Sequence, residues 1–117
     1  MDRWLRATIN TWHGLIAAAR SEAAFREELA ALALAVPFAF LVAVETWKRC
    51  LLIGVVVLLL IVELLNTAIE KLADRLTREV DPEIGRVKDM GSAAVGLALV
   101  TAIAVWLVAL AERFGWL

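Results

Sequence analysis

The sequence has few of the residues from which soluble proteins build disulfides and metal sites. It contains one cysteine, Cys50, one histidine, His13, no tyrosine and two prolines among 117 residues. A single cysteine excludes an intramolecular disulfide and a cysteine-based zinc site, and a single histidine argues against a histidine-ligated metal. We expect Cys50 to be a small buried apolar side chain. The net charge of -1 supplies no basic field for binding nucleic acid, so no nucleic-acid partner is expected.

Apolar residues, by contrast, are abundant. They make up 62% of the chain, and the mean hydropathy is +0.80, whereas soluble domains are about 45 to 50% apolar. A membrane-spanning helix needs about 20 apolar residues. We therefore predict an all-α integral membrane protein, a single membrane domain over 1–117. Its expected parts are an amphipathic surface helix and connection (1–27), span 1 (28–46), span 2 with a cytoplasmic extension (48–79), a cytoplasmic loop (80–87) and span 3 (88–112).

The basic residues predict the orientation of these spans. With three spans, nine basic residues in 1–28 and 71–89 fall on one side, and Lys48, Arg49 and Arg113 fall on the other. By the positive-inside rule the N-terminus is cytoplasmic and the C-terminus lies outside. The charges spread over residues 2–28 are not those of a cleaved secretory signal.

Near the N-terminus, apolar side chains recur at helical spacing. Leu5, Ile9, Trp12, Ile16 and Ala19 follow one another at intervals of four and three residues, which is typical of one face of an amphipathic helix. We expect this helix to lie on the cytoplasmic surface of the membrane.

A polar stripe interrupts the second apolar run. At 100° per residue Glu63, Asn66, Glu70 and Asp74 fall within an arc of about 80°, over about 16 Å of helix. A carboxylate flanked by Val62 and Leu64 costs several kcal/mol in a membrane unless it is neutralised or paired. Burial would also make Glu63 a competent proton acceptor near neutral pH. Because three short helices cannot hide this stripe from lipid, we infer an oligomer.

Polar residues also gather at the mouth of the third span. Lys88, Asp89 and Ser92 supply a cation, a carboxylate and a hydroxyl there, and such groups suit phosphate and Mg²⁺. The sequence contains no Gly-x-x-x-x-Gly-Lys-Ser/Thr loop and no Gly-x-Gly-x-x-Gly loop. Any nucleotide must therefore be bound in another way.

Three stretches together resemble a known family. They read SEAAFREE at 21–28, VELLNTAIE at 62–70 and GRVKDMGSAA at 85–94, and they resemble the small integral-membrane diacylglycerol kinases of bacteria. The resemblance implies a homotrimer in the bacterial inner membrane, with a periplasmic C-terminus and active sites shared between protomers. It also implies an enzyme that transfers the γ-phosphate of MgATP to the hydroxyl of 1,2-diacylglycerol, giving phosphatidic acid and ADP.

The resemblance also assigns roles to particular residues. Glu63 matches the family's catalytic base, with Asn66 beside it, and Glu22 and Glu70 match the carboxylates that bind Mg²⁺ with the nucleotide. Positions that contact the nucleotide are Arg3, Glu22, Glu70, Lys88 and Asp89. The region of the site that includes the lipid substrate takes in Trp12, Glu28, Glu63, Asp74 and Ser92.

Two departures from the family pattern bear on the nucleotide. Asn10 stands where an aromatic residue is expected, and residues 79–83 lack a histidine that is common in that loop. The adenine contacts of the family are therefore not carried over.

Other functions remain open on the sequence alone. Relatives of the same fold phosphorylate undecaprenol, and the sequence contains no acceptor code that separates the two lipids. A small proton-coupled transporter would use Glu63 to exchange protons. The extension of the stripe toward the cytoplasm as far as Asp74 argues against this function, because a transporter site is expected near the midplane of the membrane. A structural subunit would use the stripe only to hold helices together.

Overall fold

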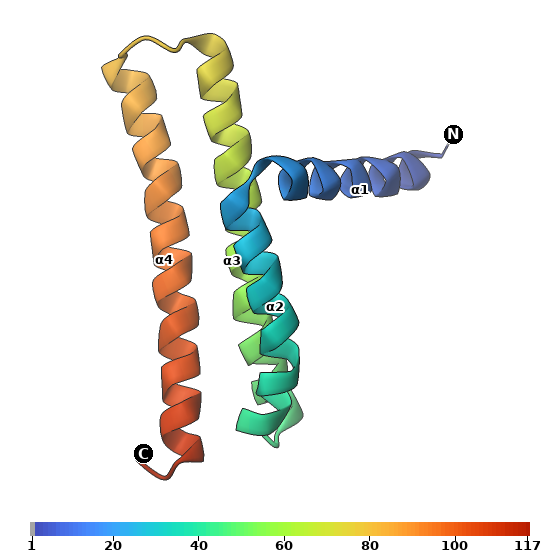
Figure 1. The fold of residues 1–117 in the computed structure, drawn as a ribbon, viewed down its shortest axis with the longest axis vertical. Helices are drawn as coiled ribbons and strands as arrows, with labels where there is room; N and C mark the ends of the chain where they lie inside the picture. Colours follow the sequence, from blue (N-terminus) through green and yellow to red (C-terminus); the bar gives the residue numbers. More distant parts are fainter. Residues whose placement is uncertain (1) are drawn as a thin grey trace.

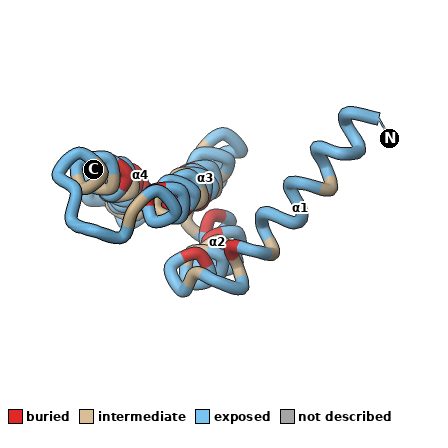
Figure 2. The backbone as a smooth tube through the Cα atoms, turned by 90° about the horizontal axis from the view of Figure 1, so that it is seen from above, coloured by how far each residue is buried: buried red, intermediate tan, exposed pale blue. Residues whose placement is uncertain are grey.

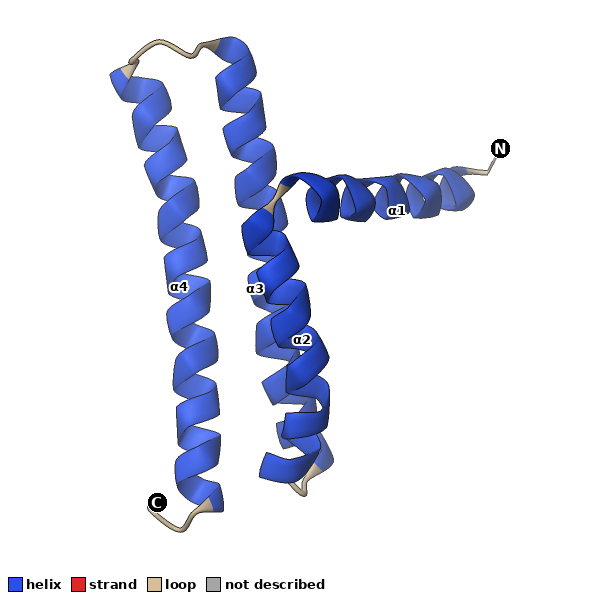
Figure 3. Ribbon diagram, viewed as in Figure 1, coloured by secondary structure: helices blue, strands red, loops and turns tan. Residues whose placement is uncertain are grey.

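The computed structural model describes residues 2–117, which fold entirely into α-helices and short connections (Figures 1 and 3). The helices are α1 (Arg3–Ser21), α2 (Ala23–Val42), α3 (Thr46–Leu76) and α4 (Pro82–Arg113). The expected all-α class is confirmed.

Helix α1 stands apart from the other three helices. It begins where the Asp2 carboxylate accepts a hydrogen bond from the Trp4 amide at 2.9 Å, and it ends at Glu22, whose backbone is extended. Arg26 of α2 reaches back and donates to the Ala19 and Arg20 carbonyls at 2.9 and 3.3 Å. These bonds satisfy carbonyls that have no partner inside the helix. The chain therefore turns sharply at one residue, and α1 projects to the side of the bundle (Figure 1).

Helix α3 is the centre of the bundle. It packs along both α4 and α2, whereas α2 and α4 scarcely meet. Phe25 and Leu60 form a small apolar cluster with Ala18 near the α1–α2 junction. Ala39 and Leu52 form a second cluster at the other end. Most residues of the single chain are exposed, and the buried ones are few (Figure 2).

The turn before α4 differs from the expected loop. Asp81 caps the helix by accepting from the Glu83 and Ile84 amides at 2.9 and 3.3 Å, and Pro82 is its first residue. Proline is well suited to that position because its missing N–H is not needed there. Residues 82–87, expected to be a cytoplasmic loop, are therefore helical, and the long helix before them ends at Leu76 instead of 79. Likewise α2 begins at Ala23, before the expected boundary at 28.

A glycine terminates α4 at its C-terminal end. Gly115 has a φ of 76°, and the Gly115 and Trp116 amides bond back to the Glu112 and Ala111 carbonyls at 3.2 and 2.8 Å. This pattern is a Schellman motif, which needs a left-handed residue at this point.

Two of the helices among residues 2–117 are long and apolar enough to cross a membrane, namely α3 and α4. In α4 only 11% of the most apolar stretch is buried inside the chain, compared with 44% in α3. Helix α2 carries Arg26, Glu27 and Glu28 near its start, so its apolar part is shorter. The expectation that Cys50 is buried is wrong, because the thiol lies on an exposed face of α3.

Candidate active site

Three polar side chains are buried on the face of α3 that meets its neighbours. Glu63, Asn66 and Thr67 each keep only 8% of their surface exposed, in a helix that is otherwise packed through leucine, valine and alanine. The polar stripe expected from the sequence is thus turned partly inward. Polar groups in such surroundings need partners.

Asn66 of α3 contacts both the next turn of its own helix and helix α4. Its Nδ2 donates to Glu70 Oε1 at 3.2 Å. Its Oδ1 is buried without a hydrogen-bond partner in the described chain, and it lies against Gly91 of α4. The asparagine therefore orients Glu70 while filling the narrow space between two helices.

The junction of α1 and α2 is held to α3 by Lys71. The Lys71 ammonium lies 3.6 Å from Glu22 Oε1 and donates to Ser21 Oγ at 2.9 Å. Glu22 is both the C-cap residue of α1 and the N-cap residue of α2. Lys71 was not among the expected site residues, and no local pattern singles it out because its partners lie about 50 positions away in the chain.

Four carboxylates gather around this junction. Glu63 experiences the negative charges of Glu70 and Glu22, and Glu28 experiences that of Glu63. Glu28 Oε2 is buried without a hydrogen-bond partner among the described residues. Neighbouring negative charges favour a bound cation or a proton. The structure thus brings together Glu22, Glu28, Glu63 and Glu70, all expected from the sequence.

These carboxylates have the chemistry that Mg²⁺ requires. Mg²⁺ usually keeps several waters and takes one or two protein carboxylates plus phosphate oxygens. Glu22 and Glu70 are both only partly exposed, so they can reach a hydrated ion without leaving the protein. Within residues 2–117 no three histidine, cysteine or acidic side chains are arranged to hold a metal ion by themselves.

A second polar contact lies farther along α3. Lys88 Nζ of α4 lies 2.5 Å from Asp74 Oδ1, and this hydrogen bond holds the pKa of Asp74 below its ordinary value. An open cavity of about 530 Å³ adjoins it, lined by Lys71, Asp74, Arg75, Thr77 and Arg78. Three cations around one cavity suit an anionic group such as a phosphate.

The remaining expected site residues are not drawn into this cluster. Asp89 and Ser92 are exposed on α4. Trp12 is 63% exposed on α1. Arg3 is the first residue of that helix, whose N-terminal end projects from the bundle (Figure 1), and its guanidinium lies over the Trp4 ring. Within one chain, Arg3 is thus separated from Glu63 by most of the length of α1.

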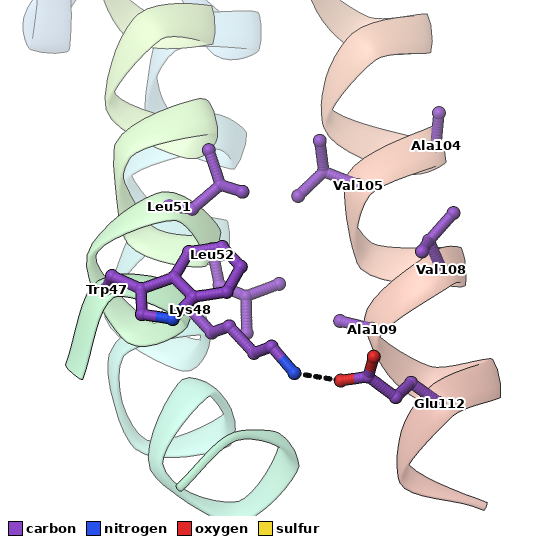
Figure 4. A pocket seen from close by; sticks show the side chains of 9 residues that line it. All are labelled: Trp47, Lys48, Leu51, Leu52, Ala104, Val105, Val108, Ala109 and Glu112. Carbon is purple, nitrogen blue, oxygen red and sulfur yellow. Dashed lines mark hydrogen bonds and ion pairs between the residues drawn. The ribbon is translucent and has the colours of Figure 1, made fainter. Parts of the chain in front are cut away.

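A different cavity lies at the opposite end of α3 and α4. It encloses about 320 Å³ between apolar walls that include Leu52, Val105 and Val108, and Lys48 and Glu112 form an ion pair across it (Figure 4). None of the expected site residues lines this cavity. We therefore assign it no part in the active site.

Comparison with known proteins identifies the family. A family model described as prokaryotic diacylglycerol kinase matches residues 9–110. The diacylglycerol kinase of Escherichia coli K12 is 46% identical over 97% of this chain and 93% of its own length. That of Pseudomonas aeruginosa PAO1 is 44% identical over 91% and 86%, and that of Haemophilus influenzae Rd 35% identical over 87% and 86%. The chain therefore belongs to the prokaryotic diacylglycerol kinase family.

Proposed function

We propose that this protein is a bacterial membrane kinase that transfers the γ-phosphate of MgATP to the hydroxyl of 1,2-diacylglycerol, giving phosphatidic acid and ADP. The observation that carries the proposal is the buried carboxylate of Glu63, set among Glu22, Asn66 and Glu70 in a chain of this family. The choice of diacylglycerol as acceptor follows the names of the relatives.

Glu63 takes the role of general base. It accepts the proton of the lipid hydroxyl as the hydroxyl oxygen attacks the γ-phosphorus, and the bond from that phosphorus to the β,γ-bridging oxygen breaks. The proton later passes to water and ADP leaves. Transfer is direct and in line, with no phosphoenzyme, since phosphoryl transfer depends mainly on positioning and charge neutralisation.

Glu22 and Glu70 would hold the Mg²⁺ that accompanies the nucleotide, and the ion would supply neutralisation of charge on the phosphates. Glu22 is fixed by Lys71 and Glu70 by Asn66, so both carboxylates are oriented before the nucleotide arrives. Lys88 and the cations around the cavity beside Asp74 attract the phosphates from the cytoplasm.

The depth of these groups follows from the position of α1. We place α1 on the cytoplasmic surface, where its exposed apolar side chains Leu5 and Trp12 enter the headgroup region. Because Ser21 bonds Lys71, residue 71 of α3 lies at that level, and Glu63 lies about 12 Å deeper at 1.5 Å per residue. A lipid hydroxyl then meets Glu63 from the membrane, and ATP meets Asp74 from the cytoplasm.

An apolar groove between α1 and α3 suits an acyl chain of the acceptor. It has a volume of about 380 Å³. Leu15, Leu64 and Thr67 are among its lining residues. Such a groove would accommodate the upper part of an acyl chain.

The complete enzyme is proposed to be a homotrimer with α2 as a third span. Leu34, Phe38, Phe40 and Leu41 of α2 are exposed in the single chain, and a lipid bilayer would cover them. The N-terminus is cytoplasmic and the C-terminus periplasmic, in the inner membrane. Arg3, distant from Glu63 in its own chain, reaches the nucleotide of a neighbouring protomer, where the exposed Asp89 and Ser92 complete the same composite site.

The test is transfer of label from γ-labelled ATP, with Mg²⁺, to diacylglycerol or undecaprenol in mixed micelles. Wild type should yield labelled phosphatidic acid, and Glu63→Gln should lose about 10²- to 10⁴-fold in kcat, the usual contribution of a general base. Glu27→Gln, the same substitution at an exposed position of α2, is the control and should retain activity.

Two results would overturn parts of the proposal. Label on undecaprenol alone would keep the mechanism and change the acceptor. If neither lipid is labelled by a well-folded oligomer, the kinase function fails, and proton-coupled transport becomes the next function to measure.

A further inference from the structure

We propose that Gly91 is a positioning residue of the active site: by having no side chain, it leaves room for the Asn66 amide that orients Glu70. The kinetic consequence of this inference rests on the proposed kinase function. The contact itself rests on the geometry of α3 and α4.

Gly91 is the point where α4 comes closest to the polar stripe. It is buried, and a Cβ built on it would overlap Asn66 Oδ1 and lie 3.3 Å from Asn66 Cγ. Gly85 and Gly96 lie on the same helix, and a Cβ at either position meets nothing within 4 Å. The requirement for glycine is therefore specific to position 91.

The orientation of the Asn66 amide is imposed by chemistry. An ionised Glu70 carboxylate can only accept hydrogen bonds, so the Nδ2 side of the amide must face Glu70. The Oδ1 side must then face α4, where Gly91 lies. A side chain at position 91 thus competes with the oxygen of the amide whose nitrogen orients Glu70.

Helix α4 cannot easily withdraw to make room. On one side of Gly91, Lys88 is bonded to Asp74 of α3. On the other side, Trp106 Nε1 donates to the Leu52 carbonyl of α3 at 3.0 Å. Since α4 is held at both ends of the contact, a methyl group at position 91 displaces the Asn66 amide, and Glu70 loses its hydrogen bond.

The test is Gly91→Ala, with Gly96→Ala as the matched control. Both substitutions raise helix propensity by the same amount, but only the first one meets a neighbour. We expect the KM for MgATP to rise about tenfold in Gly91→Ala, the effect of losing one hydrogen bond to a charged group, with the KM for diacylglycerol unchanged. Gly96→Ala should leave both values unchanged. Equal changes in both KM values for Gly91→Ala would overturn the inference.

A double-mutant cycle in thermal unfolding tests the contact without any use of activity. Gly91→Ala should raise the Tm of Asn66→Ala, because the space is then empty and only the gain in helix propensity remains. The same substitution in the wild type should change the Tm less favourably, because the methyl group meets the Asn66 amide. If Gly91→Ala does not assemble, Gly91→Ala with Asn66→Ala still should. Equal changes of Tm in both backgrounds, or failure of both variants to assemble, would contradict the inference. A wild type that labels no lipid would overturn the proposed function and leave this cycle intact.

Discussion

At the scale of single residues, Glu63 is a buried carboxylate in an apolar helix, which is costly for the folded protein. An ionised carboxylate near the centre of a membrane helix costs about 2.5 to 3.5 kcal/mol, and Glu63 is 8% exposed with Glu22 and Glu70 nearby. Such a group weakens the fold unless a ligand compensates it. Catalysis and assembly are two different explanations for keeping this carboxylate in α3, and they predict different effects of its removal.

Glu63→Gln distinguishes these two explanations by stability. A neutral amide removes the repulsion from Glu22 and Glu70, so we expect the Tm in detergent to stay equal or rise while kcat falls. Thermal unfolding followed by circular dichroism measures this. A lower Tm together with a dissociated oligomer would instead show that the carboxylate holds the helices together.

The contact of Asp74 with Lys88 predicts a pH dependence. Its hydrogen bond lowers the pKa of Asp74 below the ordinary value of 3.8. A carboxyl group with a lowered pKa in the folded state stabilises the protein above its unfolded pKa, and this contribution is lost as the pH falls through the folded value. The Tm difference between wild type and Asp74→Asn should thus be constant from about pH 8 to 5 and shrink below about pH 4. A difference that vanishes near neutral pH would contradict the assignment.

At the scale of helices, the joint between α1 and α2 sets the position of Glu22. Glu22 is the single residue between them, and it is bound by Lys71 of α3. Any rotation of α1 must therefore move this carboxylate. The bonds from Arg26 to the last carbonyls of α1 limit that rotation.

Arg26→Ala should loosen α1 selectively. Loss of about 1 kcal/mol of hydrogen bonding raises the population of the opened state about fivefold. Hydrogen exchange followed by mass spectrometry should show faster exchange in α1 and little change in α3. Arg20→Ala removes a charge from the same junction and leaves the Arg26 bonds in place, so it should have no such effect. Equal acceleration throughout the chain would argue against a local joint.

The helices were easier to predict from the sequence than the contacts between them. Apolar runs and the stripe from Glu63 to Asp74 have local periodicity, so the helical class and the part of the candidate site on α3 could be inferred from the residues. Glu22 and Glu28 were assigned by the resemblance to the family. Residues 82–87 fall in the loop expected over 80–87, whereas the structure has Asp81 and Pro82 at the start of a helix. The pairing of Lys71 with Glu22 and the fit of Asn66 against Gly91 depend on tertiary contacts, which have no local periodicity.

At the scale of the whole molecule, one chain leaves much of its apolar surface uncovered. Leu97, Val100 and Leu107 of α4 are more than half exposed. A bilayer and neighbouring protomers together would cover them. Arg3, at the start of α1, also lies away from the bundle, because α1 projects from it (Figure 2).

Mixed oligomers test whether sites are shared. Neither Glu63→Gln nor Arg3→Ala should be fully active alone. If Glu63 and Arg3 of one site come from adjacent protomers, an equal mixture should regain about a quarter of wild-type activity, because about a quarter of the sites in a cyclic oligomer then have both residues intact. Activity of coexpressed, purified mixtures measures this. A mixture no better than the two variants separately would indicate that each site lies within one chain.

The tethering of α3 at both ends has a consequence for the surrounding lipid. Near the start of α3, Lys48 is paired with Glu112 of α4, and farther along the helix Lys71 is paired with Glu22. About 35 Å of helix separates these two paired lysines. A bilayer that is too thin or too thick for this span must deform, or the helices must tilt. Either change alters the depth of the lipid hydroxyl relative to Glu63. In vesicles of increasing acyl-chain length, turnover should therefore pass through a maximum at one hydrophobic thickness and decline on both sides of it.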